Sequence, residues 1–342
     1  MTLQQLRYLL GIADSGLNIT AAAEKLHTSQ PGISKQLKLL EQELGIQLFT
    51  RKGKSLSAIT PAGHEVIERA RRIMREADNI RSLASDMSAE QEGTLSIATT
   101  HTQARYVLPD VIQAFRERYP KINLELHQGT SEQIAELVAS NSVDCAIATG
   151  AFHLFPDLML LPVYHWDRIV IVPKDHPLAV YADKEKGALT IEALAEYPQV
   201  TYVFSLTGES SFKKAFVDVG LEPDVVFTAR DADIIKTYVR MGMGVGVVAA
   251  MAWECNDKDD LVAIDARGLF PQSTTWIGFR RDTVLRGYMA EFTKLFAPHL
   301  TGEILRKATA TETQEELDAV LNDLPLPLRG GCNEEFAAEV PD

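Results

Sequence analysis

The hydrophobic period changes near residue 93 of this 342-residue chain, and that change constrains the fold more than any other feature. Up to residue 88, apolar residues recur at helical spacings of three and four. From Gly93 onward, strand-like runs such as INLELHQ and RIVIVP alternate with helical segments such as SEQIAELVAS. Strands that alternate with helices predict parallel sheets with helices on both faces. We therefore expect a helical N-terminal module joined to an α/β body, and the length of the body favours two sheets.

Three short helices are predicted at the N-terminus. LQQLRYLLGIAD (residues 3–14) gives the first, and NITAAAEKLHTS (residues 18–29) gives the second, with Asn18 as its N-cap. The third lies in TSQPGISKQLKLLEQELG (residues 28–45), with Ser29 or Gln30 as cap, Pro31 in the first turn and Gly45 as the stop. One buried stripe is expected at Ile33, Leu37, Leu40 and Leu44.

The opposite face of the third helix carries Pro31, Ser34, Lys35 and Lys38. Small polar and cationic groups on a helix that follows a tight turn predict a helix-turn-helix, because a DNA major groove admits such a helix end. A helical hairpin with a solvated outer face is the alternative. Arg51, Lys52 and Lys54 surround Gly53 between two β-prone runs, which suits a hairpin wing along a phosphate backbone.

Charge is distributed unevenly along the chain. The net charge is −13, but residues 1–88 hold twelve lysines and arginines against nine acidic residues, which leaves 22 against 38 in the remainder. A mildly basic module on an acidic body indicates that the module makes any contact with a polyanion.

A long helix is predicted from residue 61 to residue 88, with Thr60 as cap and Pro61 as its first residue. Its apolar residues alternate at spacings of four and three: Val66, Ala70, Ile73, Ala77, Ile80, Ala84 and Met87. This heptad pattern favours a dimerisation helix, and the resulting dimer would present two helix-turn-helix modules to a near-palindromic DNA site. A core helix within one subunit is the alternative.

Polar residues gather where strands of the body end. Thr100, Thr102 and Gln103 follow LSIAT, Thr149 ends VDCAIAT, and Thr207 follows VTYVFS. Ligands of open α/β sheets bind beyond the carboxyl ends of strands, so we expect these groups to hold a small anion. The threonines could instead be simple helix caps. LLPVYHW and STTWIGF are candidate hinge crossings, where Tyr164 and Trp166 either contact the ligand or pack the hinge.

The segment AAAEKLHTSQPGISKQLKLLEQELGIQLFTR resembles the N-terminal signature of LysR-type transcriptional regulators. The resemblance implies a winged helix-turn-helix, a dimerisation helix, and usually a tetramer made of two dimers. The predicted DNA-facing residues are Thr28, Ser29, Gln30, Pro31, Ser34, Lys35, Lys38, Arg51 and Lys52.

The body is similar to the CysB-like branch of that family, in TTHTQARYVLP, YHWDRIVIVPKDHPLA, FTARDADIIKTYVRMGMGVGVVA and STTWIGFRRD followed by FAPHLT. This likeness covers roughly residues 1–301. It implies the bilobal fold of periplasmic solute-binding proteins, control of sulfur-assimilation genes, and an acetylserine-like or sulfate-like effector at Thr100, Thr102, Gln103, Thr149 and Thr207. Where the branch carries a basic residue after TG, this chain has Glu209.

The expected organisation is therefore an α/β chain in four parts. Residues 1–60 form the winged helix-turn-helix and residues 61–88 the linker and dimerisation helix. Residues 89–301 form the effector domain, with one lobe at about 93–164 and 268–300 and the other at 165–267. Residues 302–342 form an acidic tail, with a short helix (ETQEELDAVLNDL) followed by disordered chain.

Several classes of function are disfavoured. No GxSxG, HExxH or P-loop pattern occurs, so we expect neither an enzyme nor a cofactor. Cys145, Cys255 and Cys332 lie far apart with no zinc spacing, which favours a reducing cytoplasm, with Cys145 in the core. We expect no signal peptide, because the first apolar run is interrupted by Gln and Arg, and no stretch approaches 18 uninterrupted apolar residues. We expect promoter DNA, a small effector, a second copy of the chain and possible contact with RNA polymerase, and no membrane. The alternatives are a LysR-type regulator of another anion or an aromatic acid, or an enzyme or solute carrier on a bilobal body.

Overall fold

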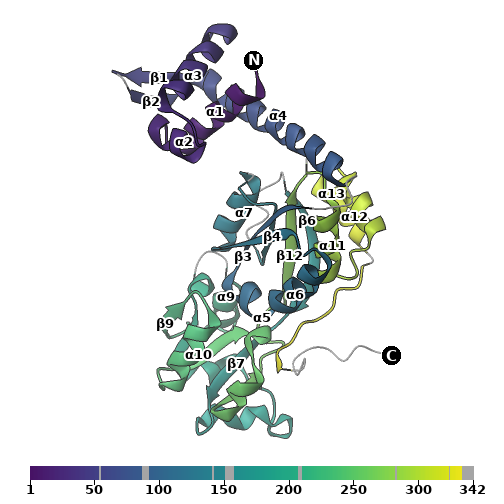
Figure 1. Cartoon of the computed structure of the whole chain (residues 1–342). Coiled ribbons are helices and arrows are strands. Elements are labelled where there is room, and N and C mark those ends of the chain that lie inside the picture. Colours follow the sequence, from purple (N-terminus) through teal and green to yellow (C-terminus); the bar gives the residue numbers. More distant parts are fainter. Residues whose placement is uncertain are drawn as a thin grey trace. The chain divides into compact units, whose positions relative to one another are not determined.

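The computed structural model of the chain describes residues 1–332 except 54, 87–91, 141, 151–157, 207–209, 282 and 323. It divides into two compact units, Met1–Glu90 and Gln91–Asp342, which are described separately below (Figure 1). Among the described residues, no helix combines the length and apolar character needed to cross a membrane.

The first unit contains the three predicted short helices, α1 (Leu3–Asp14), α2 (Ile19–Lys25) and α3 (Gln30–Leu44). The expected caps are confirmed, because the Asn18 side chain accepts hydrogen bonds from the start of α2 and the Ser29 hydroxyl accepts one from the Gly32 amide. Gly45 ends α3 in the left-handed conformation at φ 69°. The α3 stripe packs into the core of this unit through Ile33, Leu37 and Leu40.

The wing and the long helix follow. β1 (Phe49–Lys52) and β2 (Ser55–Ile59) pair antiparallel. α4 (Pro61–Asp86) begins after Thr60, whose hydroxyl accepts from the Gly63 amide at 2.9 Å. Within its own unit α4 buries Ile67, Ala70 and Met74, whereas Ile73 and Ile80 of the predicted seam remain 40% and 60% exposed. Met87 lies outside the described residues.

The second unit contains two five-stranded sheets (Figure 1). We call lobe 1 the sheet β4-β3-β5-β12-β6 with α5, α6, α7 and α11 to α13, and lobe 2 the sheet β11-β7-β10-β8-β9 with α8 to α10. The strands of lobe 1 are β3 (Gly93–Thr99), β4 (Ile122–Gln128), β5 (Cys145–Ala148), β6 (Leu158–Trp166) and β12 (Ser273–Arg280). Those of lobe 2 are β7 (Arg168–Pro173), β8 (Gln199–Tyr202), β9 (Val225–Ala229), β10 (Val245–Ala249) and β11 (Leu261–Asp265).

The helices of the second unit lie in the helical segments that alternate with strand-like runs in the sequence. Those of lobe 1 are α5 (His101–Tyr106), α6 (Leu108–Arg118), α7 (Ser131–Ala139), α11 (Gly287–Phe296), α12 (Gly302–Thr309) and α13 (Gln314–Leu321). Those of lobe 2 are α8 (Ile191–Ala195), α9 (Ser211–Val217) and α10 (Ala232–Arg240), with the short 3-10 turns η5 (Ala250–Ala252) and η6 (Cys255–Asp259) after β10.

The expected parallel pairing is found in part of each sheet, and each sheet also contains antiparallel pairs. β3 pairs parallel with β4 and β5, and β8 with β9 and β10, but β12 runs antiparallel to β5 and β6, and β7 runs antiparallel to β10 and β11. The reason is that the chain passes between the sheets directly, from β6 into β7 and from β11 towards β12, without a crossover helix to restore the parallel direction.

The two candidate hinge crossings lie inside strands of lobe 1. LLPVYHW belongs to β6 and STTWIGF to β12, and these strands pair with each other along their length. The passage between lobes falls at Asp167, the single residue between β6 and β7, and at residues 266–272 between β11 and β12.

The chain beyond residue 301, expected as an acidic tail, continues the fold of lobe 1. Besides the predicted helix α13, it forms α12, which the sequence reading missed. Leu305, Ala308, Leu317 and Leu321 are buried in the lobe 1 core. Residues 333–342 lie outside the described residues.

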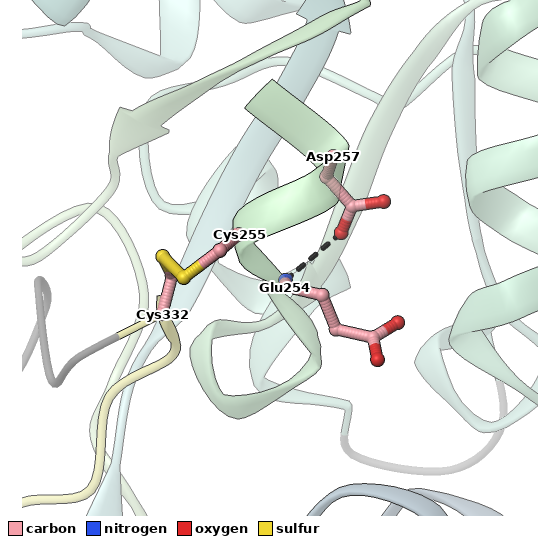
Figure 2. Close-up of a disulfide and its surroundings, with 4 residues drawn as sticks. All are labelled: Glu254, Cys255, Asp257 and Cys332. Atoms are coloured by element: carbon pink, nitrogen blue, oxygen red, sulfur yellow. Dashed lines mark hydrogen bonds between the residues drawn. A yellow bond between two sulfur atoms is a disulfide. The ribbon is translucent and has the colours of Figure 1, made fainter. Parts of the chain in front are cut away.

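A disulfide joins Cys255 to Cys332, residues separated by 77 positions, which the reading of three isolated cysteines did not anticipate (Figure 2). Sequence spacing could not reveal the pair, because only the path of residues 324–332 along β6 of lobe 1 and then onto lobe 2 brings Cys332 to η6. Cys145 is fully buried and free, as predicted.

We predict that Gly63→Ala destabilises the first unit. A methyl group at Gly63 would lie 2.1 Å from the Leu48 carbonyl oxygen, and this backbone atom cannot swing aside as a side chain could. Overpacking of this kind costs about 1–3 kcal/mol. Hydrogen exchange should therefore accelerate at the Thr60 amide, which donates to the same Leu48 carbonyl. Ala62→Ser, at the exposed neighbouring position, is the control; equal protection in both variants would contradict the prediction.

Candidate functional site

The N-terminal end of α3 presents an exposed polar and cationic face. Ser29, Gln30, Pro31, Lys35 and Lys38 are exposed, while Thr28 and Ser34 are half-buried. The Gln30 side-chain amide donates to the Ser34 hydroxyl at 3.1 Å, so these two side chains lie together on the helix surface. Among the described residues, no carboxylate pairs with Lys35 or Lys38. Their charges therefore remain available to an external anion.

The wing adds further cations. Arg51 and Lys52 are exposed on β1, opposite Leu56 and Ser55 of β2. Arg51 lies 3.5 Å from Glu41 of α3, which places the wing cation beside that helix. The predicted DNA-facing residues therefore all belong to one compact unit, on α3, on the turn before it and on the strand after it.

In the second unit, Gln103 links side chains from three elements. Gln103 is buried on α5, the Tyr164 hydroxyl of β6 donates to its carbonyl oxygen, and its amide donates to the Thr275 hydroxyl of β12 at 3.3 Å. Burial raises the pKa of Tyr164 to about 12, so this phenol remains a donor at neutral pH. The structure thus brings Gln103 and Tyr164, two of the predicted effector residues, together.

Thr149 and Trp166 join the same cluster. The Trp166 indole N–H donates to the Thr149 hydroxyl at 3.2 Å, and Thr149 lies 3.4 Å from the hydroxyl of Thr275. Thr275 is therefore the centre that connects Gln103 to Thr149. Sequence reasoning missed Thr275, because it lies on β12, 126 residues from Thr149.

Thr102 and Thr100 occupy different settings on α5. Thr102 interacts with Tyr202, a buried residue at the end of β8 in lobe 2, and this interaction partly offsets the rise in the pKa of Tyr202 that burial causes. Thr100 is the N-cap of α5 but makes no capping hydrogen bond with its side chain. The reading of these threonines as simple caps therefore does not hold for Thr100, whose half-buried hydroxyl has no partner among the described residues. Thr207 and Glu209 lie outside the described residues.

α5 also contacts lobe 2 through charged groups. The Arg105 guanidinium lies 3.0 Å from Glu254, and the Tyr106 hydroxyl donates to Asp233 at 2.7 Å. The helix that carries the predicted effector residues therefore lies where the two lobes meet.

Arg168 is a functional candidate that the sequence reading missed. It is 5% exposed, and burial lowers its pKa to about 10, so it is still charged at neutral pH. Its guanidinium lies over the rings of Trp166 and Phe270 at 5.8 and 5.7 Å, and one terminal nitrogen donates to the Ser211 hydroxyl at 3.0 Å. Its Nε has no partner, and no carboxylate of the described residues pairs with it.

The alternation of side chains along extended chain is the sequence signal that could have identified Arg168. Tyr164, Trp166 and Arg168 alternate along continuous extended chain, so their side chains share a face. An isolated buried charge is costly unless an anion compensates it. Trp166, whose ring lies against the Arg168 guanidinium, donates a hydrogen bond to Thr149, so this charge lies beside the polar cluster.

His101, Asp231 and Asp233 are the described residues whose atoms lie close enough together to hold a metal ion. However, Asp231 caps α10 through the Ile234 amide, and Asp233 accepts from Tyr106. These hydrogen bonds give both carboxylates a structural role, and we assign no metal to the three residues.

Comparison with known proteins decides the family. Residues 88–301 match the LysR substrate binding domain, and residues 3–64 match the bacterial regulatory helix-turn-helix protein of the lysR family. The chain belongs to the LysR family. Both matches are to transcriptional regulators rather than to enzymes, as the sequence predicted.

Relatives within the LysR family support the expected branch. The chain is 50% identical over 308 residues to the HTH-type transcriptional regulator CysB of Haemophilus influenzae, covering 90% of this chain and 94% of that protein. It is 45% identical over 300 residues to SsuR of Burkholderia cenocepacia, covering 88% and 96%. The crystal structure of the cofactor-binding domain of the Cbl transcriptional regulator aligns with a TM-score of 0.60 at 40% identity, covering 66% of this chain and 97% of that one. The predicted resemblance to the CysB-like branch is confirmed.

We predict opposite outcomes for removing two buried cations. Arg168→Met should change the free energy of unfolding of the second unit little or raise it, because the charge it removes has no anionic partner. Lys236→Met should cost about 1.5–3 kcal/mol, because it removes the ammonium that lies 2.9 Å from the buried Asp257 and leaves this carboxylate with Arg240, at 2.7 Å, as its remaining cation. Urea unfolding followed by tryptophan fluorescence reports this unit alone, since Trp166, Trp253 and Trp276 all belong to it. Equal losses in both variants would show that Arg168 is compensated internally.

Proposed function

We propose that this chain is a ligand-responsive regulator that binds promoter DNA through α3 and the β1–β2 wing and senses a small anionic metabolite in its second unit. The observation that carries the DNA part is the exposed face of α3, where Lys35 and Lys38 have no carboxylate partner among the described residues. Cations held out to solvent at the start of a helix suit phosphate contact, and the small polar side chains beside them suit base edges.

The effector proposal rests on Arg168 and its neighbours. A buried guanidinium without a carboxylate, beside a cluster that contains the side chains of Gln103 and Thr149, suits a ligand with an anionic group and several hydrogen-bonding atoms. Acetylserine and sulfate both fit this description. Control of sulfur-assimilation genes in the cytoplasm is the corresponding role, supported by the similarity to CysB and SsuR.

A second copy of the chain is part of this proposal. Ile73 and Ile80 lie seven positions apart on α4 and remain largely exposed within the first unit, as expected for a seam that pairs with another α4. A dimer carries two α3 helices, one for each half-site of a DNA site with two half-sites. Two such dimers would form the tetramer that the family resemblance implies. The effector then acts by binding one arrangement of the subunits more tightly than another.

We predict that Lys35→Ala combined with Arg51→Ala weakens binding to a promoter fragment and makes it less sensitive to salt. Each lost phosphate contact should reduce the slope of log affinity against log salt by ~0.9, so the double variant should lose ~1.8. Fluorescence anisotropy at several salt concentrations measures both quantities. Lys174→Ala, an exposed lysine of the second unit, is the control and should leave the slope unchanged. If the slope of log affinity against log salt were unaltered in the double variant, the proposed DNA-binding surface on α3 and the wing would be refuted.

We predict that Arg168→Met weakens binding of the anionic effector by about 10- to 100-fold, the loss of a charge-assisted hydrogen bond of about 1.5–3 kcal/mol. Titration calorimetry of the full chain with acetylserine, sulfate and an aromatic acid would identify the ligand and measure the loss. Arg267→Met is the control, because this arginine of lobe 2 is already paired with Asp265. If the effector bound Arg168→Met as tightly as the unmodified chain, the buried cation would have no role in recognition.

A further inference from the structure

The end of the described chain crosses from lobe 1 to lobe 2. Residues 324–332, which we call the strap, leave α13 and run past the end of β6 to η6 (Figure 1). The His165 amide donates to the Pro327 carbonyl at 2.9 Å, and the Arg329 amide donates to the His165 carbonyl at 2.8 Å. His165 stands two residues before Asp167, so the strap pairs with the chain at its passage between the lobes.

The far end of the strap is fastened to lobe 2 in two ways. The Cys332 amide donates to the Trp253 carbonyl at 2.8 Å, and the Cys332 sulfur is bonded to Cys255. Gly331 fits closely against lobe 2, because a Cβ atom there would lie 2.4 Å from the Ala250 carbonyl oxygen. With the disulfide closed, the strap is a third connection between the lobes, in addition to Asp167 and residues 266–272.

Lobe 2 holds its half of the disulfide firmly. The Glu254 amide donates to Asp257 at 2.9 Å, the contact drawn beside the disulfide in Figure 2. The Lys236 ammonium lies 3.1 Å from the Glu254 carboxylate and 2.9 Å from the Asp257 carboxylate. These contacts position η6 independently of the sulfur–sulfur bond. Opening the bond would therefore release the strap and leave η6 in place.

The disulfide is accessible to small molecules in solution. Cys255 is exposed and Cys332 is half-buried, in contrast to the fully buried Cys145, whose thiol pKa is raised by that burial. The function proposed above places the chain beside DNA in a reducing compartment, where protein disulfides are usually catalytic or redox-sensing rather than permanent. An accessible pair in that setting suits reversible exchange.

We propose that Cys255 and Cys332 form a reversible redox-modification site, with a low-molecular-weight disulfide such as oxidised glutathione as its oxidant, and that closing the bond fastens the strap across the passage between the lobes. The Cys255 thiolate attacks the small disulfide, forms a mixed disulfide and expels one thiolate. The Cys332 thiolate then attacks the Cys255 sulfur and expels the second. Two protein thiols are oxidised, and one small disulfide is reduced to two thiols.

The strap also contacts the effector site directly. The Arg329 guanidinium lies over the ring of Tyr164 at 5.6 Å, and Tyr164 donates to Gln103. Release of the strap therefore removes a cation from one wall of the polar cluster.

The test uses the full chain in glutathione buffers that range from fully oxidised to fully reduced. Thiol labelling followed by mass spectrometry should show Cys255 and Cys332 becoming free thiols together at an intermediate ratio of oxidised to reduced glutathione. Hydrogen exchange at the amides of His165, Arg329 and Cys332 should then accelerate at least about tenfold, because the closed bond restricts the strap. Cys332→Ser should exchange at the fast rate in every buffer. Cys145→Ala, which keeps the pair, should behave like the unmodified chain.

Three results would overturn the proposal. If the Cys255–Cys332 disulfide stays closed at every glutathione ratio, it is a structural cross-link. If it never closes, the two cysteines do not form a redox-modification site. Unchanged exchange after reduction, or in Cys332→Ser, would show that the strap is held without the bond. These measurements need neither DNA nor effector, so failure here is separable from failure of the proposed regulator function.

Discussion

The structure of the second unit depends on the extended chain through Asp167, which connects the two sheets by a single residue. Because side chains alternate along extended chain, Tyr164, Trp166 and Arg168 lie on one face, two before the passage and one after it. Tyr164 and Trp166 bond to Gln103 and Thr149 of lobe 1, whereas Arg168 bonds to Ser211 of lobe 2. A change in the angle at Asp167 would therefore alter both halves of the polar cluster together.

The parts of the fold that local chemistry determines were predictable from the sequence. α3 begins and ends as expected, because the Ser29 cap and the Gly45 stop act within a few residues of the backbone they terminate. β7 and β10 match their apolar runs because buried strands leave continuous hydrophobic segments. The polar residues after β3 and β5 were located correctly for the same reason, since they follow strands that the sequence marks clearly.

The features that were missed depend on pairing between distant segments. The antiparallel direction of β12, the bridging position of Thr275 and the Cys255–Cys332 bond all depend on contacts across tens of residues or more, which a single sequence does not encode in any local pattern. Arg168 was overlooked for a different reason. It opens the apolar run RIVIVP, and a charge at the edge of a strand is usually exposed, whereas here the rings of Trp166 and Phe270 cover it.

The helices beyond residue 301 have a consequence for where the effector half ends. The family match stops at residue 301, yet Leu305 and Leu317 are 3% and 0% exposed within the lobe 1 core. A fragment cut at the family boundary would uncover an apolar surface beside α11 and β6, and such surfaces promote aggregation. The self-sufficient folding unit is thus longer than the segment that matches the substrate-binding domain, because α12 and α13 shield part of its core from water.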